Sequence, residues 1–279
     1  MVRLAKQLSG QVYTFKEKYM VYFVATPIGN LSEITFRAVQ VLKSVSAIFC
    51  EDTRHSQILL NNYQISKPLY SYHKFNEKKS LDFVLSFCQK QQDIAVISDA
   101  GMPGINDPGN ILVNALKENN FPYTVVSGAS AFVNAFVMSG YQPPFTYYGF
   151  LPEKTSDREA LLDGSVGVGI FYLSVHDIKE NMRYLCKRLG NRPCCLVKEL
   201  SKTHEKAVFC HLGDEIDDDK GEFVLVVDRQ NEQNPLCKLT VQEHINYYVS
   251  GGMTKNDAIK AVAKDRNLPK NEIYRQSLK

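Results

Sequence analysis

The sequence lacks the patterns that mark membrane-spanning, secreted and metal-binding proteins. None of its apolar runs approaches the roughly 20 residues that a helix needs to cross a bilayer, and the first residues contain no apolar stretch like that of a secretory signal. The seven cysteines are odd in number and form no Cys-x-x-Cys pair, which is typical of reduced core thiols. The acidic run at residues 214–219 lacks the spacing of a calcium-binding loop. We therefore expect a cytoplasmic protein with no membrane segment and no metal site.

Motifs for nucleotide phosphates and for catalytic nucleophiles are also absent. The chain contains no Gly-x-Gly-x-x-Gly and no Gly-x-x-x-x-Gly-Lys-Ser/Thr, so neither a dinucleotide fingerprint nor an NTP-binding loop is predicted. Ser130 does not lie in a Gly-x-Ser-x-Gly turn, which argues against a hydrolase nucleophile. The formal net charge of +3 permits a nucleic-acid partner but does not indicate one.

Strand-like apolar runs alternate with amphipathic helices through the first half of the chain. The runs that predict strands are 21–25, 47–50, a short stretch near Leu69, 94–97 and 123–126. Apolar positions at helical spacing across 34–45 predict the first helix, with Asn30 and Ser32 as candidate caps. The alternation predicts an α/β fold with a mostly parallel sheet covered on both faces.

The pattern changes at Pro143 and Pro144, which break any helix. Beyond them, strands in direct succession predict a second, mixed α/β domain with an antiparallel portion. The chain ends in three short, lysine-rich helical segments, which are typical of a helix-turn-helix or of a packing appendage that touches only protein. The predicted organisation is an extension at 1–19, a first α/β domain at 20–144, a second at 145–230 and a helical domain at 238–279.

The most unusual stretch is the loop at 98–109, which carries three glycines and two prolines directly after an apolar strand. Two other small-residue loops, 27–30 and 127–131, also follow predicted strands. Because the carboxyl ends of parallel strands meet at one edge of a sheet, we expect the three loops to form a single ligand-binding crevice. Such a backbone-lined crevice suits a cofactor of mixed charge, and S-adenosylmethionine is one candidate.

Seven short blocks of the sequence, in order along the chain, resemble the signature blocks of one family. They are 25–31, 51–54, 71–73, 98–109, 149–152, 170–172 and 199–205. The family is the bacterial 16S ribosomal RNA cytidine 2'-O-ribose methyltransferases, within the tetrapyrrole-methylase superfamily. The resemblance implies a homodimeric, two-domain enzyme that binds S-adenosylmethionine between its domains. It also implies a target ribose in the decoding region of the small ribosomal subunit.

The resemblance assigns roles to individual residues. The implied cofactor contacts are Pro27, Gly29, Asp99, Ala100, Gly101, Ile105, Ser130, Ala131 and Leu173. We hypothesise that Glu51 or Asp52 accepts the hydroxyl proton, while Arg54, His73 and Lys74 hold RNA phosphates. The alternative for residues 51–54 is a local ion pair at a helix start, where acidic side chains are favoured.

Two stretches depart from the family pattern. Residues 127–130 read Ser-Gly-Ala-Ser where the family has Pro-Gly-Pro-Ser, and residues 173–177 read Leu-Ser-Val-His-Asp where it has Glu-Ser-Pro-His-Arg. The changes fall at Ser127, Ala129, Leu173, Val175 and Asp177. Two rival functions stay open. One is a methylase of the same superfamily that acts on a tetrapyrrole, and the other is a non-catalytic protein that binds RNA or the ribosome, which the departures at Ser127, Ala129 and Leu173 keep open.

Overall fold

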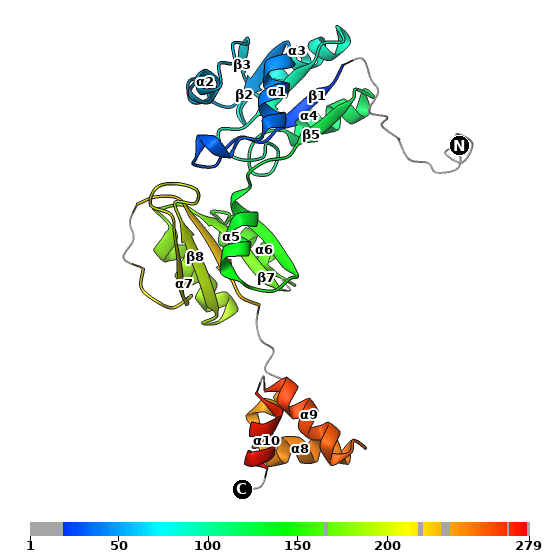
Figure 1. Cartoon of the computed structure of the whole chain (residues 1–279), viewed down its shortest axis with the longest axis vertical. Coiled ribbons are helices and arrows are strands. Elements are labelled where there is room, and N and C mark those ends of the chain that lie inside the picture. The colour runs from blue at the N-terminus through cyan, green and yellow to red at the C-terminus, as the bar shows by residue number, and fades with distance from the viewer. Residues whose placement is uncertain (1–18, 165–166, 217–219, 230–234, 267, 278–279) are drawn as a thin grey trace, which may run out of the picture. The chain divides into compact units, whose positions relative to one another are not determined.

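The first half of the chain forms a five-stranded parallel sheet in the computed structural model (Figure 1), which describes residues 19–164, 167–216, 220–229, 235–266 and 268–277. The strands are β1 (Val21–Val24), β2 (Ala47–Cys50), β3 (Leu69–Ser71), β4 (Ile94–Ile97) and β5 (Tyr123–Val126). They lie in the order β3-β2-β4-β1-β5, and every pair is parallel. All residues of β2 and β4 are buried, as expected for strands covered on both faces. The predicted parallel sheet is confirmed.

Four helices cover this sheet. They are α1 (Phe36–Ser44), α2 (Thr53–Asn62), α3 (Glu77–Gln89) and α4 (Asn110–Glu118). The apolar side chains of α1 and α2 pack on one face, and those of α3 and α4 pack on the other. The predicted caps of the first helix are wrong: Thr35 caps α1 by accepting from the Ala38 N–H at 3.0 Å. Asn30 caps a separate 3-10 turn, η1 (Leu31–Glu33), because the backbone is extended at Ile34.

The second half of the same unit contains a mixed sheet, as predicted. Its strands are β6 (Phe145–Phe150), β7 (Val168–Leu173), β8 (Pro193–Lys198), β9 (Lys206–His211) and β10 (Phe223–Val227). They lie in the order β6-β7-β10-β8-β9, with β6 parallel to β7 and the other pairs antiparallel. On one face lie α6 (Thr155–Leu162), which the sequence pattern did not reveal, and α7 (Ile178–Leu189).

The other face of the mixed sheet is covered by α5 (Ala131–Ser139), which precedes β6 in the chain. Figure 1 shows α5 beside the second sheet. The boundary at residue 144 therefore stays a prediction: the second sheet begins at Phe145, yet the helix before it packs on that sheet.

The chain divides into two compact units at Asp228 and Arg229. The second unit contains η2 (Pro235–Lys238), α8 (Val241–Ser250), α9 (Lys255–Asp265) and α10 (Lys270–Gln276). A capping box between Thr240 and Glu243 begins α8, and Ile245, Ile259 and Ile273 lie in a shared core. The three predicted helices are thus present. Within the described part of the chain, each helix is too short or too polar to span a bilayer.

Candidate active site

Two of the predicted loops are joined by backbone pairing at the carboxyl edge of the parallel sheet. The N–H of Thr26 donates to the carbonyl of Gly101 at 2.9 Å, and the N–H of Gly101 donates back at 3.2 Å. The Thr26 hydroxyl also donates to the carbonyl of Ser98 at 3.1 Å. Gly101 has a φ of +82°, a conformation that glycine adopts without strain. The start of the 98–109 loop is therefore held against the end of β1.

The far end of the same loop is held by a buried carboxylate. Oε1 of Glu77 accepts from the Gly109 N–H and from the Tyr72 hydroxyl, both at 2.9 Å. Tyr72 and Glu77 are buried, so the three groups form a hydrogen-bonded unit away from water. The 98–109 loop is therefore fixed at both ends.

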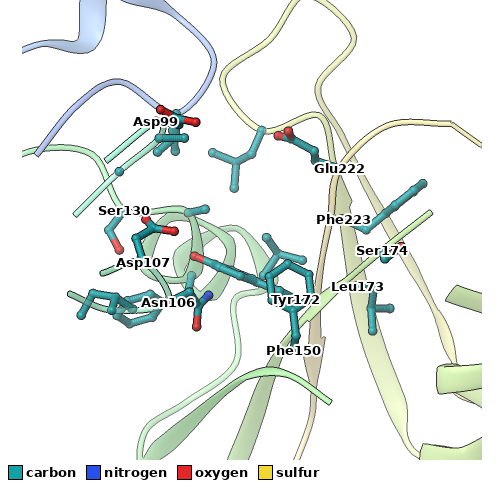
Figure 2. A pocket seen from close by; sticks show the side chains of 18 of the residues that line it. Asp99, Asn106, Asp107, Ser130, Phe150, Tyr172, Leu173, Ser174, Glu222 and Phe223 are labelled. Atoms are coloured by element: carbon teal, nitrogen blue, oxygen red, sulfur yellow. The ribbon is translucent and has the colours of Figure 1, made fainter. Parts of the chain in front are cut away.

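Between the two sheets lies a cavity of about 520 Å³. One wall comes from the loops after β4 and β5, and the other comes from β7 and the segment that leads into β10. Figure 2 shows Asp99, Asp107 and Ser130 on one side and Tyr172 and Glu222 on the other. A cavity is thus present at the strand ends, lined on the side of the parallel sheet mainly by the 98–109 and 127–131 loops with Ile28 from the 27–30 loop, and its role as a ligand site stays a prediction.

The cavity has an acidic lining. Glu51, Asp99, Asp107 and Glu222 contribute carboxyl groups, and none of the described residues that line it is Lys, Arg or His. Partial burial raises the pKa of Glu51 above its ordinary value, and the nearby carboxylates of Asp107 and Asp99 raise it further, while His73 acts in the opposite direction. Burial also raises the pKa of Asp107. The site thus holds carboxylates that are more basic than usual and that attract a cation.

Aromatic side chains form the opposite wall. The hydroxyl of Tyr172 points toward Asp107 and Ser130 (Figure 2). Behind it, the Asn106 amide donates to the Tyr147 hydroxyl at 2.5 Å, which ties the 98–109 loop to β6. Burial raises the pKa of both tyrosines, so they are neutral phenols at physiological pH. Gly149 allows this contact, because a Cβ there would lie 2.8 Å from the Asn106 side-chain oxygen.

Most of the predicted cofactor residues meet in this cavity. Those that line it are Asp99, Ala100, Gly101, Ile105, Ser130, Ala131 and Leu173. Pro27 and Gly29 line an adjoining hollow of about 320 Å³, which shares Ile28 and Asp99 with the cavity. A Cβ on Gly29 would lie 2.8 Å from the Leu200 carbonyl. Close approach of the second half of the unit therefore explains Gly29 without a ligand.

The two catalytic candidates, adjacent in sequence, have different surroundings. Glu51 lines the cavity. Asp52 instead caps α2, accepting from the Arg54 N–H at 2.8 Å and pairing with the Arg54 guanidinium at 3.0 Å. These hydrogen bonds lower the pKa of Asp52 to about 2. Asp52 is thus a weak base, held in the local ion pair that the sequence analysis gave as the alternative. Of the two acids, Glu51 is therefore the better candidate for the proton acceptor.

The three RNA-binding candidates lie outside the cavity lining. The side chain of Arg54 is 90% exposed although its guanidinium contacts Asp52. His73 and Lys74 occupy the turn between β3 and α3. Their assignments stay predictions.

Comparison with known proteins adds independent observations. Residues 20–215 match the tetrapyrrole (corrin/porphyrin) methylases. The chain is 38% identical over 271 residues to ribosomal RNA small subunit methyltransferase I of Bacillus subtilis, covering 91% of this chain and 92% of the relative. The corresponding protein of Mycoplasmopsis pulmonis is 44% identical over 216 residues, covering 74% and 96%. The chain belongs to the tetrapyrrole methylase family. Within it, the chain groups with the ribosomal RNA small subunit methyltransferase I proteins.

Several solved structures of low sequence identity share the fold. A uroporphyrin-III-C-methyltransferase from Thermus thermophilus matches with a TM-score of 0.58 and 17% identity, over 75% of this chain and 94% of that one. The same kind of enzyme complexed with S-adenyl homocysteine matches with a TM-score of 0.55 and 15% identity, over 75% and 96%. A diphthine synthase matches with a TM-score of 0.59 and 11% identity, over 76% and 90%.

The departures from the family pattern lie close to the cavity or behind it. Leu173, where the family pattern has an acid, borders the cavity, but its side chain is 2% exposed and packs in the core with α6 and α7. Val175 also lines the cavity, and Asp177 precedes α7 without a side-chain capping bond. In the 127–130 loop, a Cβ on Gly128 would lie 2.8 Å from that of Ala25. Gly128 is therefore needed for close packing, whatever its neighbours are.

Several lining residues were not singled out from the sequence. Asp107 and Asn106 lie inside the recognised loop, whereas Phe223 begins β10 and Glu222 immediately precedes it. No motif marks Glu222. Only the sheet order, which places β10 in the middle, brings it to the cavity.

Proposed function

We propose that this protein is a cytoplasmic, homodimeric methyltransferase that uses S-adenosylmethionine to methylate the ribose 2'-hydroxyl of a cytidine in 16S ribosomal RNA. The observation that carries the proposal is the acidic cavity at the carboxyl edge of the parallel sheet. The names of the close relatives support ribosomal RNA of the small subunit as the substrate. The related methylase that binds S-adenyl homocysteine supports the cofactor.

The described residues fit S-adenosylmethionine. A volume of about 520 Å³ lies within the usual range for cofactor sites, about 300–1,000 Å³. The flat backbone at Ala100 and Gly101 and the apolar side chain of Ile105 offer surfaces for an uncharged ring. The carboxylates of Asp99 and Glu222 are suited to the cationic amino and sulfonium groups. When bound, the cofactor supplies an electrophilic methyl group.

We assign Glu51 as the acceptor of the proton from the ribose hydroxyl. A hydroxyl that receives a methyl group must lose its proton, and a carboxylate with a raised pKa accepts it more readily than an ordinary one. Burial and two neighbouring carboxylates give Glu51 this property. Tyr172 and Asn106 then shape the wall that excludes water.

The acidic lining also bears on the rival substrate. Tetrapyrrole intermediates carry several carboxylates, which four carboxyl groups in the cavity would repel. A ribose is neutral, and its phosphates are free to lie outside the cavity, where Arg54, His73 and Lys74 are exposed or partly exposed. This contrast favours RNA.

The test is transfer of radiolabelled methyl groups from S-adenosylmethionine to small ribosomal subunits from cells that lack the endogenous activity. Naked 16S RNA serves as the parallel substrate, and the labelled nucleotide is mapped. We expect label on one cytidine ribose. Bound cofactor with no label on either substrate would redirect the proposal to a tetrapyrrole. Neither label nor a cofactor-dependent rise in melting temperature would leave only the non-catalytic alternative.

A further inference from the structure

The turn that follows β3 exposes a large aromatic side chain beside basic residues. Phe75 is 90% exposed, an unusual state for a side chain that gains free energy from burial. Its ring contacts the His73 ring edge-on, with centroids 6.1 Å apart. We name residues 73–79 the turn platform. Its exposed ring has no role in the packing of either sheet.

The backbone beneath this ring is well fixed. The His73 N–H donates to the Asn76 side chain at 2.8 Å, and the Asn76 amide donates to the Ser71 carbonyl at 3.1 Å. The Phe75 N–H donates to Nδ1 of His73 at 3.2 Å. Because the backbone of the turn is held by these hydrogen bonds, it presents Phe75 at a fixed position, and little backbone entropy is lost when a ligand contacts the ring.

The turn platform is positively charged. Lys74, Lys78 and Lys79 lie within six positions of one another, and none pairs with an acid among the residues that the structure describes. The acid in this segment, Glu77, is buried and bonded to Tyr72 and Gly109. The outward charge is therefore basic, which complements a phosphate backbone.

The sheet register places the turn platform beside the cavity. Ser71 at the end of β3 is opposite Cys50 at the end of β2, and the Tyr72 N–H donates to the Cys50 carbonyl at 2.8 Å. The next residue after Cys50 is Glu51, which lines the cavity and is influenced by His73. A strand of RNA whose ribose reaches Glu51 would thus pass over the turn platform.

We propose that Phe75 stacks on a nucleobase of the single-stranded RNA segment that carries the target ribose, with the three lysines at its phosphates. An exposed aromatic ring among lysines is the combination that binds single strands, because every base offers a π-face and every linkage a negative charge. This inference rests on the proposed function, from which it takes the RNA. It adds the surface that orients the strand.

The absence of tryptophan from the sequence makes a direct test available. In F75W the only indole of the protein would lie at the proposed contact. Titration with a single-stranded RNA matching the mapped target should quench its fluorescence, since stacked bases quench indole emission. The matched control is F209W, which places the indole at a residue 63% exposed on β9. Strong quenching in F75W with little in F209W supports the proposal. Equal quenching in both would overturn it.

Kinetics separate this inference from the proposed function. F75A should raise the KM for the RNA substrate about tenfold, as expected for the loss of one stacked base. The kcat and the affinity for S-adenosylmethionine should stay within about twofold, F75Y should restore the KM, and F209A should leave it unchanged.

An unaltered KM in F75A, with an active wild type, would overturn the inference. So would a change in oligomeric state on sedimentation, which would assign Phe75 to a protein contact. A wild type that methylates no RNA would overturn the proposed function instead. F75W would then be titrated with an unstructured oligocytidine, so that base stacking is still measured without a mapped target.

Discussion

Two neighbouring carboxylates, Glu51 and Asp52, have different pKa values because their surroundings differ. Glu51 faces other acids in a half-buried wall, which raises its pKa. Asp52 accepts hydrogen bonds from Arg54, which lower its pKa to about 2. Pairs of acids whose pKa values are pushed apart often take different parts in one site. Here the first has the property of a proton acceptor, and the second has the property of a helix cap.

We therefore expect E51Q to lower kcat by about 100-fold or more, the usual contribution of a general base, with little loss of cofactor affinity. Single-turnover methyl transfer and calorimetry measure the two quantities. D52N is the matched control, because asparagine keeps the capping oxygen. Equal activity of E51Q and wild type would remove Glu51 from the mechanism.

The pH dependence gives a second prediction at this scale. A base must be deprotonated to act, so activity should fall as the pH drops through the pKa of Glu51, which lies above the ordinary glutamate value. D107N removes a negative charge that raises this pKa. The acid limb of the kcat profile should consequently move to lower pH in D107N. An acid limb that moves to higher pH in D107N, or does not move, would contradict the assignment of Glu51 as the base.

At the scale of elements, the 98–109 loop owes its shape to contacts at its two ends. One is the backbone bridge between Thr26 and Gly101, and the other is the bond from Gly109 to buried Glu77. Glu77 lies on α3, whose first turn belongs to the turn platform. The Glu77 carboxylate thus connects the 98–109 loop to the turn platform.

We expect E77A to weaken S-adenosylmethionine binding about tenfold and to lower the melting temperature. The substitution leaves the Gly109 N–H and the Tyr72 hydroxyl without their buried acceptor, a loss of about 1–3 kcal/mol. E77Q keeps an acceptor oxygen and should have a smaller effect on both quantities. Calorimetry and thermal unfolding measure them. If E77Q and E77A were equally impaired, the charge and not the hydrogen bonds would matter.

The sequence predicted regular elements better than their junctions. Apolar runs such as 47–50 and 94–97 are strands at the predicted positions, because burial on both faces leaves a continuous apolar signal. The helix at 155–162 was missed, since Leu162 is its one buried residue and the periodic signal is weak. The cap at Thr35 was missed because Asn30 and Ser32, also capping residues, precede it.

For the site, the sequence located the side built from contiguous loops. Asp99 to Gly101 and Ser130 lie where the strand–loop pattern placed them. Glu222 and Phe150 were not found, because the contacts that bring them to the cavity join positions far apart in the chain. The pairing of sheet strands sets such contacts, and no local pattern encodes them.

At the scale of the whole molecule, the C-terminal unit has a core of its own. Ile245, Ile259 and Ile273 are each 1% exposed or less and lie in one cluster. We expect I259A to destabilise this unit by about 2–5 kcal/mol, the usual result of truncating a buried isoleucine. Calorimetry should show its unfolding at a lower temperature, while the cofactor-dependent rise in the melting temperature of the first unit persists. Loss of that rise would show that the two units are coupled.

The position of β10 affects the order in which the nascent chain can fold. It is the last strand of the second sheet in the chain and the middle strand of that sheet in space, between β7 and β8. As the chain leaves the ribosome, the first sheet can close once β5 has emerged. Until β10 emerges, the second sheet can form only as two separate strand pairs, β6–β7 and β8–β9. Each pair has an unpaired edge that could pair with the wrong strand. Only synthesis of β10 joins the halves, and residues 222–224, where it begins, complete the cavity wall. A nascent chain would therefore complete its second sheet and the wall of the cavity in one late step.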